Sequence, residues 1–308
     1  MDHRTYLKID LNKLEHNYNS VRNKLPSGVK LLGVIKANAY GNGAVEIGKF
    51  LDDKCDFFGV ACIEEAIELK KAGIKTPILI LGRVFPFDVE KAVKYDIRIP
   101  IFSYDDAVIL SNEAVKQNKN MPYHFCIDTG MSRIGFQVNE ESADICKRIT
   151  ELPNIFAEGM FSHFATSDEA DLSKAVEQRN KYKRFCKMLS DRKIEIPIKH
   201  LNNSAGIMNF DEYFDMCRMG IVTYGLYPSE EVDKSLLDIE PIMSWYTKIS
   251  HIKELEPKRE ISYGGTFITE KTTKVATIPI GYADAFPRCL SNKGKVIICL
   301  LYTSPSPR

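Results

Sequence analysis

The stretch LLGVIKANAYGNG, residues 31–43, decides the fold because it shows the unit that the first 230 or so residues repeat. An apolar run is followed by a turn with polar or glycine residues, and then by a helical stretch. Such runs are continuous rather than alternating, which indicates strands buried on both faces. Eight of them predict eight strands: Leu31–Ile35, Phe57–Cys62, Pro77–Leu81, Ile97–Phe102, Tyr123–Ile127, Ile155–Phe161, Ile198–Leu201 and Met216–Val222.

The segments between these runs show helical periodicity. Leu14, Tyr18, Val21 and Leu25 recur on one face of a helix, for example. Strands that alternate with helices predict an α/β fold, and eight of them fit a (β/α)8 TIM barrel over residues 10–230. A doubly wound open sheet is the alternative, but it needs a glycine-rich turn after the first strand, and the sequence has none there.

After about Tyr227 the sequence changes, because apolar runs continue without strong helices between them. The runs are Ser244–Ile252, Lys274–Ile280 and Lys295–Leu300. They predict a partial, mostly β domain over residues 231–300, to which we assign the opening strand of residues 4–9. The end, LYTSPSPR at residues 301–308, contains two prolines, so we expect it not to continue a sheet and to be a non-native-looking tail.

Composition excludes several classes of protein. The 308 residues predict about two domains, and 42 Lys and Arg against 41 Asp and Glu leave a net charge of +1, so we expect no nucleic-acid partner. We expect the start MDHRTYLKID not to be a signal peptide, because it lacks a basic start followed by an apolar stretch, and no apolar run is long enough to span a membrane. Eight cysteines without a CxxC pair indicate reduced thiols, and six histidines without HxH or HExxH spacing indicate no metal site. We therefore expect a cytoplasmic protein.

Charged residues at the carboxyl ends of the predicted strands are candidate site residues, since barrel enzymes place their chemistry there. Lys36 lies at the end of an apolar run and Arg218 inside one, and an unpaired charge is costly in either place. Lys36 is either a lysine with a buried stem and an exposed amine, or a desolvated lysine that forms a Schiff base. Arg133 lies in a glycine-containing loop, and His163 taken alone is more typical of a structural histidine.

Small residues after the last two barrel strands predict a phosphate site. Asn203 and Ser204 can cap a helix, Gly220 and Ile221 can offer backbone N–H groups, and Tyr40 lies in the first loop. A phosphate cradle, a Schiff-base lysine and a group for a ring nitrogen together indicate pyridoxal phosphate as the cofactor.

Seven motifs in order resemble the alanine racemase family: VIKANAYGNG, DTGMSRIGF, SHFATSDE, NNSAG, RMGIVTYGLYP, ISYGGTF and IPIGYADAFPR. The resemblance runs from near residue 4 to about residue 298. It implies a pyridoxal-phosphate-dependent racemase that interconverts L-alanine and D-alanine and supplies D-alanine for peptidoglycan. It also implies a cytoplasmic homodimer with shared active sites.

The resemblance assigns roles to the matching positions. Lys36 would hold the cofactor and act as one acid/base group, and Tyr263 from the partner subunit would be the other. Arg218 would donate to the pyridine nitrogen, and His163 would bridge Arg218 and Tyr263. Arg133 would contact the phenolic oxygen of the cofactor and the substrate carboxylate. The remaining expected contacts are Tyr40, Asn203, Ser204, Gly220 and Ile221 around the phosphate side of the cofactor, and Tyr282 and Asp168 along the substrate path.

The sequence departs from the family pattern in three places. Cys126 stands where many members have a lysine, often carbamylated, that supports the arginine here numbered Arg133. Asn42 replaces the histidine of the common YGHG. The chain stops before a Met-Asp segment and a later tyrosine of the family, so we expect an incomplete racemase with little or no activity.

Three other functions compete with this one. A racemase for serine or another small amino acid would share the same barrel motifs. A decarboxylase on the same barrel usually presents an acidic residue to the ring nitrogen, and Arg218 argues against it. A non-enzymatic pyridoxal-phosphate-binding barrel would lack a second domain, and the strands after Tyr227 argue against that.

Overall fold

The computed structural model describes residues 3–298 and 301–303, and the chain divides into two compact units. The larger unit is Asp10–Ile242, and the smaller unit combines Met1–Ile9 with Met243–Arg308. Each unit is described by itself below.

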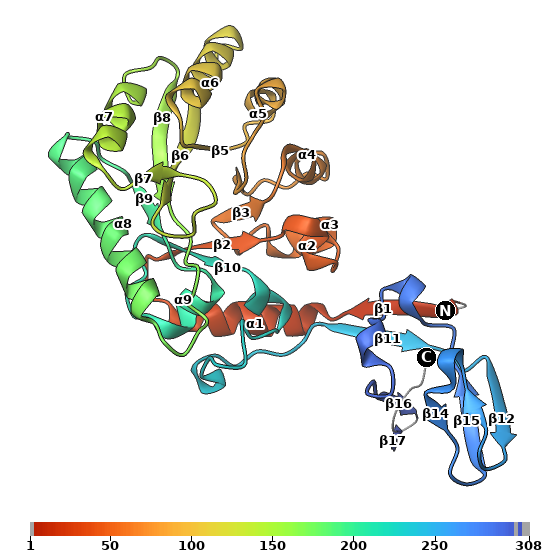
Figure 1. Cartoon of the computed structure of the whole chain (residues 1–308). Coiled ribbons are helices and arrows are strands. Elements are labelled where there is room, and N and C mark those ends of the chain that lie inside the picture. Colours follow the sequence, from red (N-terminus) through yellow and green to blue (C-terminus); the bar gives the residue numbers. More distant parts are fainter. Residues whose placement is uncertain (1–2, 299–300, 304–308) are drawn as a thin grey trace. The chain divides into compact units, whose positions relative to one another are not determined.

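The larger unit is a barrel of parallel strands surrounded by helices (Figure 1). Four strands pair in the order β10-β2-β3-β4 and four in the order β5-β6-β8-β9. A parallel bridge between Leu79 and Arg98 joins β4 to β5. The amide of Arg218 donates to the carbonyl of Asn202 (2.9 Å) and joins β9 to β10, so the ring is closed. The barrel strands are β2 (Lys30–Val34), β3 (Phe57–Val60), β4 (Ile78–Ile80), β5 (Ile99–Ile101), β6 (Met121–Asp128), β8 (Ile155–Phe161), β9 (Ile198–His200) and β10 (Met216–Met219).

Every one of the eight predicted apolar runs overlaps a barrel strand, so the (β/α)8 barrel is confirmed and the open sheet is excluded. Between the strands lie α1 (Leu11–Lys24), α2 (Lys36–Tyr40), α3 (Ala44–Leu51), α4 (Ile63–Lys71), η1 (Pro86–Asp88), α5 (Val89–Lys94), α6 (Tyr104–Lys116), α7 (Glu140–Ile149), α8 (Ser173–Asp191), α9 (Ser204–Asn209), η2 (Ile221–Tyr224) and η3 (Lys234–Leu236). A two-residue strand, β7 (Phe136–Gln137), pairs with β6.

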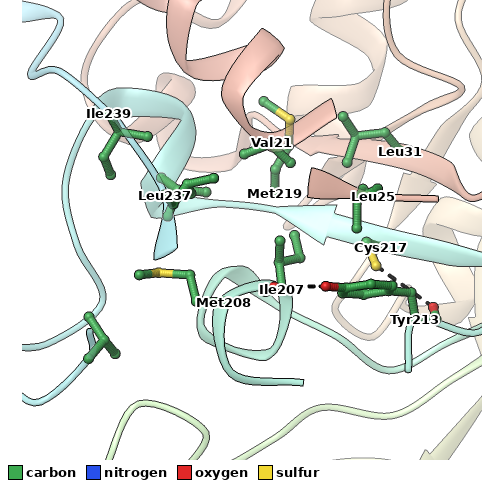
Figure 2. Packing of buried hydrophobic residues seen from close by; sticks show 12 residues of the cluster. Val21, Leu25, Leu31, Ile207, Met208, Tyr213, Cys217, Met219, Leu237 and Ile239 are labelled. Atoms are coloured by element: carbon green, nitrogen blue, oxygen red, sulfur yellow. Dashed lines mark hydrogen bonds between the residues drawn. The ribbon is translucent and has the colours of Figure 1, made fainter. Parts of the chain in front are cut away.

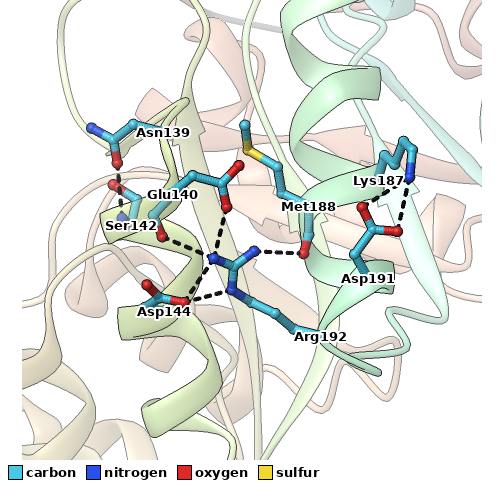
Figure 3. A network of polar contacts seen from close by, with 8 residues as sticks. All are labelled: Asn139, Glu140, Ser142, Asp144, Lys187, Met188, Asp191 and Arg192. Atoms are coloured by element: carbon cyan, nitrogen blue, oxygen red, sulfur yellow. Dashed lines mark hydrogen bonds and ion pairs between the residues drawn. The ribbon is translucent and has the colours of Figure 1, made fainter.

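Polar side chains fix where the helices begin and end. Ser103 and Asn139 accept hydrogen bonds from the third residue of α6 and of α7, as N-caps do. The C-cap of α8, Arg192, ties that helix to α7 through ion pairs of 2.7 Å to Glu140 and Asp144 (Figure 3). These contacts hold neighbouring βα units in register around the barrel.

The core of the larger unit extends past the boundary that we predicted at residue 230. Figure 2 shows Leu237 and Ile239 in one apolar cluster with Val21 and Met219, and all four side chains are at most 7% exposed. Residues 231–242 therefore pack against the barrel, because their apolar side chains complete its core rather than that of the second unit.

The smaller unit consists of paired antiparallel strands and short 3-10 turns. The pairs are β1 (Thr5–Ile9) with β11 (Met243–Thr247), β12 (His251–Leu255) with β15 (Thr273–Thr277), β13 (Glu260–Ile261) with β14 (Phe267–Ile268), and β16 (Val296–Ile298) with β17 (Leu301–Thr303). The turns are η4 (Tyr263–Gly265), η5 (Tyr282–Asp284) and η6 (Arg288–Leu290). The mostly β second domain is thus confirmed.

Our expectation that residues 301–308 do not continue a sheet is wrong for the first three, which form β17. Strand pairing needs backbone N–H groups, and the two prolines come later, at 305 and 307. Residues 304–308 and Cys299 lie outside the described residues. The described cysteines are all free, and no described helix is long and apolar enough to cross a membrane.

Candidate active site

The predicted site residues of the larger unit follow the carboxyl ends of its strands. Lys36 follows β2, Arg133 follows β6, His163 follows β8, Ser204 follows β9 and Gly220 follows β10. Parallel strands in a barrel bring these ends to one face. Two predicted residues, Tyr263 in η4 and Tyr282 in η5, belong to the smaller unit and are 78% and 65% exposed.

Lys36 begins an unusual turn. The next four residues, Ala37 to Tyr40, all have φ between 50° and 56°, so α2 is one turn of left-handed backbone. Such backbone costs an L-residue roughly 1–2 kcal/mol. The Glu65 carboxylate holds the start of the turn, because one oxygen accepts from the Ala37 amide (2.7 Å) and the other from the Ala61 amide (2.8 Å). The turn is therefore imposed by its surroundings.

The Lys36 amine lies in a partly buried, positively charged environment. Burial lowers its pKa, the Arg133 guanidinium lowers it further, and the Glu65 carboxylate opposes both effects. A lysine with a lowered pKa has a larger neutral fraction, and the neutral amine is the form that attacks a carbonyl. Of the two interpretations of Lys36, the environment favours the reactive one.

Arg218 is almost fully buried, with 3% of its surface exposed. It donates to the carbonyls of Ser162 (2.8 Å), Leu201 (2.9 Å) and His200 (3.1 Å), and its Nη2 lies 3.1 Å from His163 Nδ1. Burial lowers its pKa to about 10, which still leaves the guanidinium charged at neutral pH. Arg218 is thus a fixed cation that can only donate.

His163 is a neutral imidazole in this setting. Burial and the charges of Arg218 and Arg133 lower its pKa to about 3. Because its Nδ1 faces a donor of Arg218, Nδ1 is the acceptor and Nε2 carries the proton. The structure therefore joins His163 to Arg218, although taken alone in the sequence it was more typical of a structural histidine.

Lys36, Arg133 and Arg218 form a group of cations in which the Glu65 carboxylate acts on Lys36 only from a distance. Within the ranges that the structure describes, none of the three makes an ion pair with a carboxylate. Like charges that share a site repel, and an anionic ligand relieves that repulsion. The group suits a ligand with negative charge.

A second set of groups converges around Gly220. Its amide donates to Ser204 Oγ (2.9 Å), and a Cβ atom built on Gly220 would lie 3.5 Å from Ser204 Oγ and 3.4 Å from the Tyr40 hydroxyl. Ile221 is the first residue of η2 directly behind it. Two hydroxyls and backbone amides around a space that a side chain would fill suit a phosphate group.

Asn203 and Asp168 have structural contacts of their own. Asn203 Oδ1 accepts from the Gly206 amide and from Ser167 Oγ, both at 2.9 Å, so it is the N-cap of α9. The carbonyl of Asp168 accepts from the Ser229 hydroxyl. These contacts fix the loop that follows β8 and the start of α9.

Cys126 differs from the family lysine in charge. It is 3% exposed, and burial raises its pKa to about 12, so it is a neutral thiol. It supplies no negative charge to Arg133.

Four residues that are hydrogen-bonded to segments of this site, directly or through one another, were not found from the sequence: Glu65, His124, Glu158 and His200. Each of the last three is a polar residue in a mostly apolar strand, as Arg218 is, and that signal could have identified them. Glu65 lies on α4 and carries no such signal.

A closed (β/α)8 barrel with this group of cations and a phosphate-sized cradle at the carboxyl ends of its strands defines the class of barrel enzymes with an anionic ligand. Comparison with known proteins is more specific. Residues 9–228 match the model of the alanine racemase N-terminal domain, and residues 242–300 match that of its C-terminal domain. Alanine racemase of Clostridium tetani is 43% identical over 295 residues, which are 95% of this chain and 76% of that protein.

Comparison with solved structures indicates the same family. Alanine racemase of Clostridium difficile 630 superimposes with a TM-score of 0.94 at 40% identity, covering 98% of this chain and 79% of that one. Alanine racemase of Bartonella henselae was solved with covalently bound pyridoxal phosphate. It superimposes with a TM-score of 0.82 at 29% identity, covering 95% of this chain and 80% of that one. The chain belongs to the alanine racemase family, and it is an isomerase that interconverts the enantiomers of alanine.

Proposed function

We propose that the chain racemises alanine with pyridoxal phosphate bound at the carboxyl face of the barrel. The observation that carries this proposal is the cradle of Gly220, Ser204 and Tyr40 in the same set of strand-end loops as Lys36. The covalent pyridoxal phosphate of the Bartonella henselae relative supports it. When bound, pyridoxal phosphate supplies an aldehyde that a lysine amine can hold and a ring that accepts electrons from the substrate Cα.

The residues of the larger unit have separate tasks in this proposal. Lys36 holds the cofactor, and its amine moves a proton to or from one face of the substrate Cα atom. Arg218 donates to the ring nitrogen and gives up no proton there, which restrains side reactions of the ring. Arg133 binds the substrate carboxylate and the phenolic oxygen of the cofactor.

The phosphate side of the cofactor lies against Tyr40, Ser204, Gly220 and Ile221, and Asn203 holds that loop as the cap of α9. These groups bind and orient, and they take no part in proton transfer.

The second proton-transfer group is Tyr263, which acts on the opposite face of Cα and belongs to the partner subunit of a homodimer. Inversion needs two groups on opposite faces, because one group would return the proton to the side it came from. His163 bridges Arg218 and Tyr263 in this arrangement. Tyr282 and Asp168 line the path of the substrate.

D-Alanine made in this way supplies peptidoglycan synthesis in the cytoplasm. The near-neutral net charge of +1 is compatible with a small amino-acid substrate.

One experiment tests the cofactor and its attachment together. The chain is loaded with pyridoxal phosphate, reduced with borohydride and digested, and the modified peptide is identified by mass spectrometry. We expect the label on Lys36. We also expect the unreduced protein to exchange the Cα proton of L-alanine in D2O at a low rate, in keeping with our expectation of little activity. Lys49→Ala, on the exposed face of α3, is the matched control and should label normally. Label on any other lysine, or no label, contradicts the proposal.

A further inference from the structure

Arg218 is the end of a buried chain of hydrogen bonds that runs into the barrel. Its Nη1 lies 3.1 Å from His200 Nδ1, and His200 Nε2 lies 2.9 Å from His124 Nδ1. His124 Nε2 lies 3.2 Å from Glu158 Oε2. Both imidazoles are fully buried, at 0% exposure.

The chain passes through the strands from one end of the barrel toward the other. Arg218 is on β10, His200 on β9, His124 on β6 and Glu158 on β8. At the far end Arg98, which directly precedes β5, donates to both oxygens of Glu158 at 3.1 and 3.2 Å. Arg98 thus lies at the amino end of its strand, whereas the candidate active site lies at the carboxyl ends.

The Glu158 carboxylate sets the direction of every bond in this chain. An ionised carboxylate only accepts, so His124 must carry its proton on Nε2, which leaves Nδ1 as an acceptor. His200 must then carry its proton on Nε2, and its Nδ1 faces Arg218 as an acceptor. With the opposite tautomer, His200 would point an N–H at a guanidinium N–H.

The charge states agree with this direction. Burial lowers the pKa of His124, and burial together with the charge of Arg218 lowers the pKa of His200 well below its usual range, so both rings are neutral. Burial alone would raise the pKa of Glu158, but hydrogen bonds from His124 and Arg98 outweigh it and bring the pKa to about 2.

We propose that Glu158, acting through His124 and His200, is a positioning residue that fixes the Arg218 guanidinium toward the cofactor. The Arg218 side chain makes no ion pair with a carboxylate among the described residues, and its Nη1 is held by the carbonyl and the ring of His200. Glu158 keeps that ring in the accepting tautomer. The inference rests on the proposed function, in which Arg218 faces the ring nitrogen.

The test on the unmodified protein is nitrogen NMR of the 308-residue chain labelled with 15N-histidine, without cofactor. Each ring nitrogen shows whether it carries a proton, and His124→Gln and His200→Gln variants assign the signals. We expect a protonated Nε2 and an unprotonated Nδ1 on both rings. A proton on His200 Nδ1, or a doubly protonated ring, overturns the inference whether or not the chain binds cofactor.

The test of function compares Glu158→Leu with Arg98→Met. Loss of the carboxylate leaves the tautomer of His200 set by Arg218 alone, so we expect the preference for that tautomer to weaken and the His200 nitrogen signals to shift. The absorbance of bound pyridoxal phosphate should also shift, and kcat should fall roughly ten- to a hundredfold with KM unchanged, as for the loss of one charge-assisted hydrogen bond. Arg98→Met keeps the Glu158 carboxylate hydrogen-bonded to His124. It should therefore leave the His200 tautomer, the absorbance of bound pyridoxal phosphate and kcat unchanged. An unchanged His200 signal and absorbance in folded Glu158→Leu would refute the role of Glu158. If neither the unmodified chain nor the Arg98→Met variant binds pyridoxal phosphate but the tautomers are as expected, the proposed function is wrong. The inferred direction of the hydrogen bonds is then still supported.

Discussion

The two units of the chain bury their side chains very differently. The larger unit has a core of fully buried apolar residues, among them Leu31, Leu32 and Phe58 at 0% exposure. In the described part of the smaller unit, Thr269 is the one buried side chain, and Ile252 and Ile297 are 58% and 64% exposed. The barrel is therefore stabilised by apolar burial, whereas the strands of the smaller unit are held mainly by backbone pairing.

The two proposed proton-transfer residues follow the same division. Lys36 lies partly buried among cations in a loop that Glu65 holds, and Tyr263 is 78% exposed in a short turn. A preorganised group and an exposed group should respond differently to substitution. The predictions below test this contrast, beginning with the largest effect.

Lys36→Ala should remove both cofactor attachment and racemisation, because Lys36 is the amine proposed to hold the cofactor and to move the proton. The measurements are borohydride labelling and Cα-proton exchange, with an expected loss of at least about a thousandfold in rate. Labelling that persists at full level in this variant would show that the barrel does not hold the cofactor through Lys36.

Tyr263→Phe should leave cofactor attachment intact and lower racemisation by roughly a hundred- to ten-thousandfold, the range for loss of one acid/base group. The ring is kept and only the hydroxyl is lost. Normal labelling with slow inversion would separate the two units by task. Normal inversion would show that the second group lies elsewhere.

Leu32→Ala should lower the free energy of unfolding by about 2–5 kcal/mol, because it leaves a cavity in the barrel core. Ile252→Thr in β12 should change it by no more than about 0.5 kcal/mol, since the side chain is mostly exposed and Thr keeps the β-branch. Urea unfolding measures both. Equal effects would contradict the contrast between the units.

Lowering the pH from 7.5 to 5 should destabilise the barrel. His124 and His200 have lowered pKa values when folded, so the unfolded chain takes up protons below about pH 6.5 that the folded chain does not. Their contribution is complete above that pH and is lost progressively below it. Urea unfolding at both pH values measures the loss, and His200→Gln should reduce it. An unchanged stability would mean that the rings are already protonated when folded.

The barrel was predictable because each strand carries its own signal. A run such as Leu31–Ile35 is apolar and short, and the helix after it is periodic, so local sequence specifies both elements. The N-caps Ser103 and Asn139 are likewise local, each acting on an amide three residues away. The boundary near residue 230 was less predictable, because Leu237 and Ile239 look like part of any apolar segment until their packing partners are known.

The polar interior of the barrel was not predictable for the opposite reason. His124 and His200 are 76 residues apart, and Glu158 is 34 residues from His124, so their hydrogen bonds exist only when the ring of strands closes. The left-handed turn after Lys36 was not predictable from the sequence either. Alanine at 37 and 39 favours ordinary right-handed helix, and the Glu65 carboxylate that opposes this preference comes from another βα unit.

That left-handed turn sets the requirements of thermal stability against those of catalysis. Glycine at position 37 or 39 adopts positive φ without strain, so it would relieve the backbone. The same substitution would loosen the segment that orients the Lys36 amine. Selection for a more heat-resistant protein and selection for a faster one should therefore choose different residues at these positions.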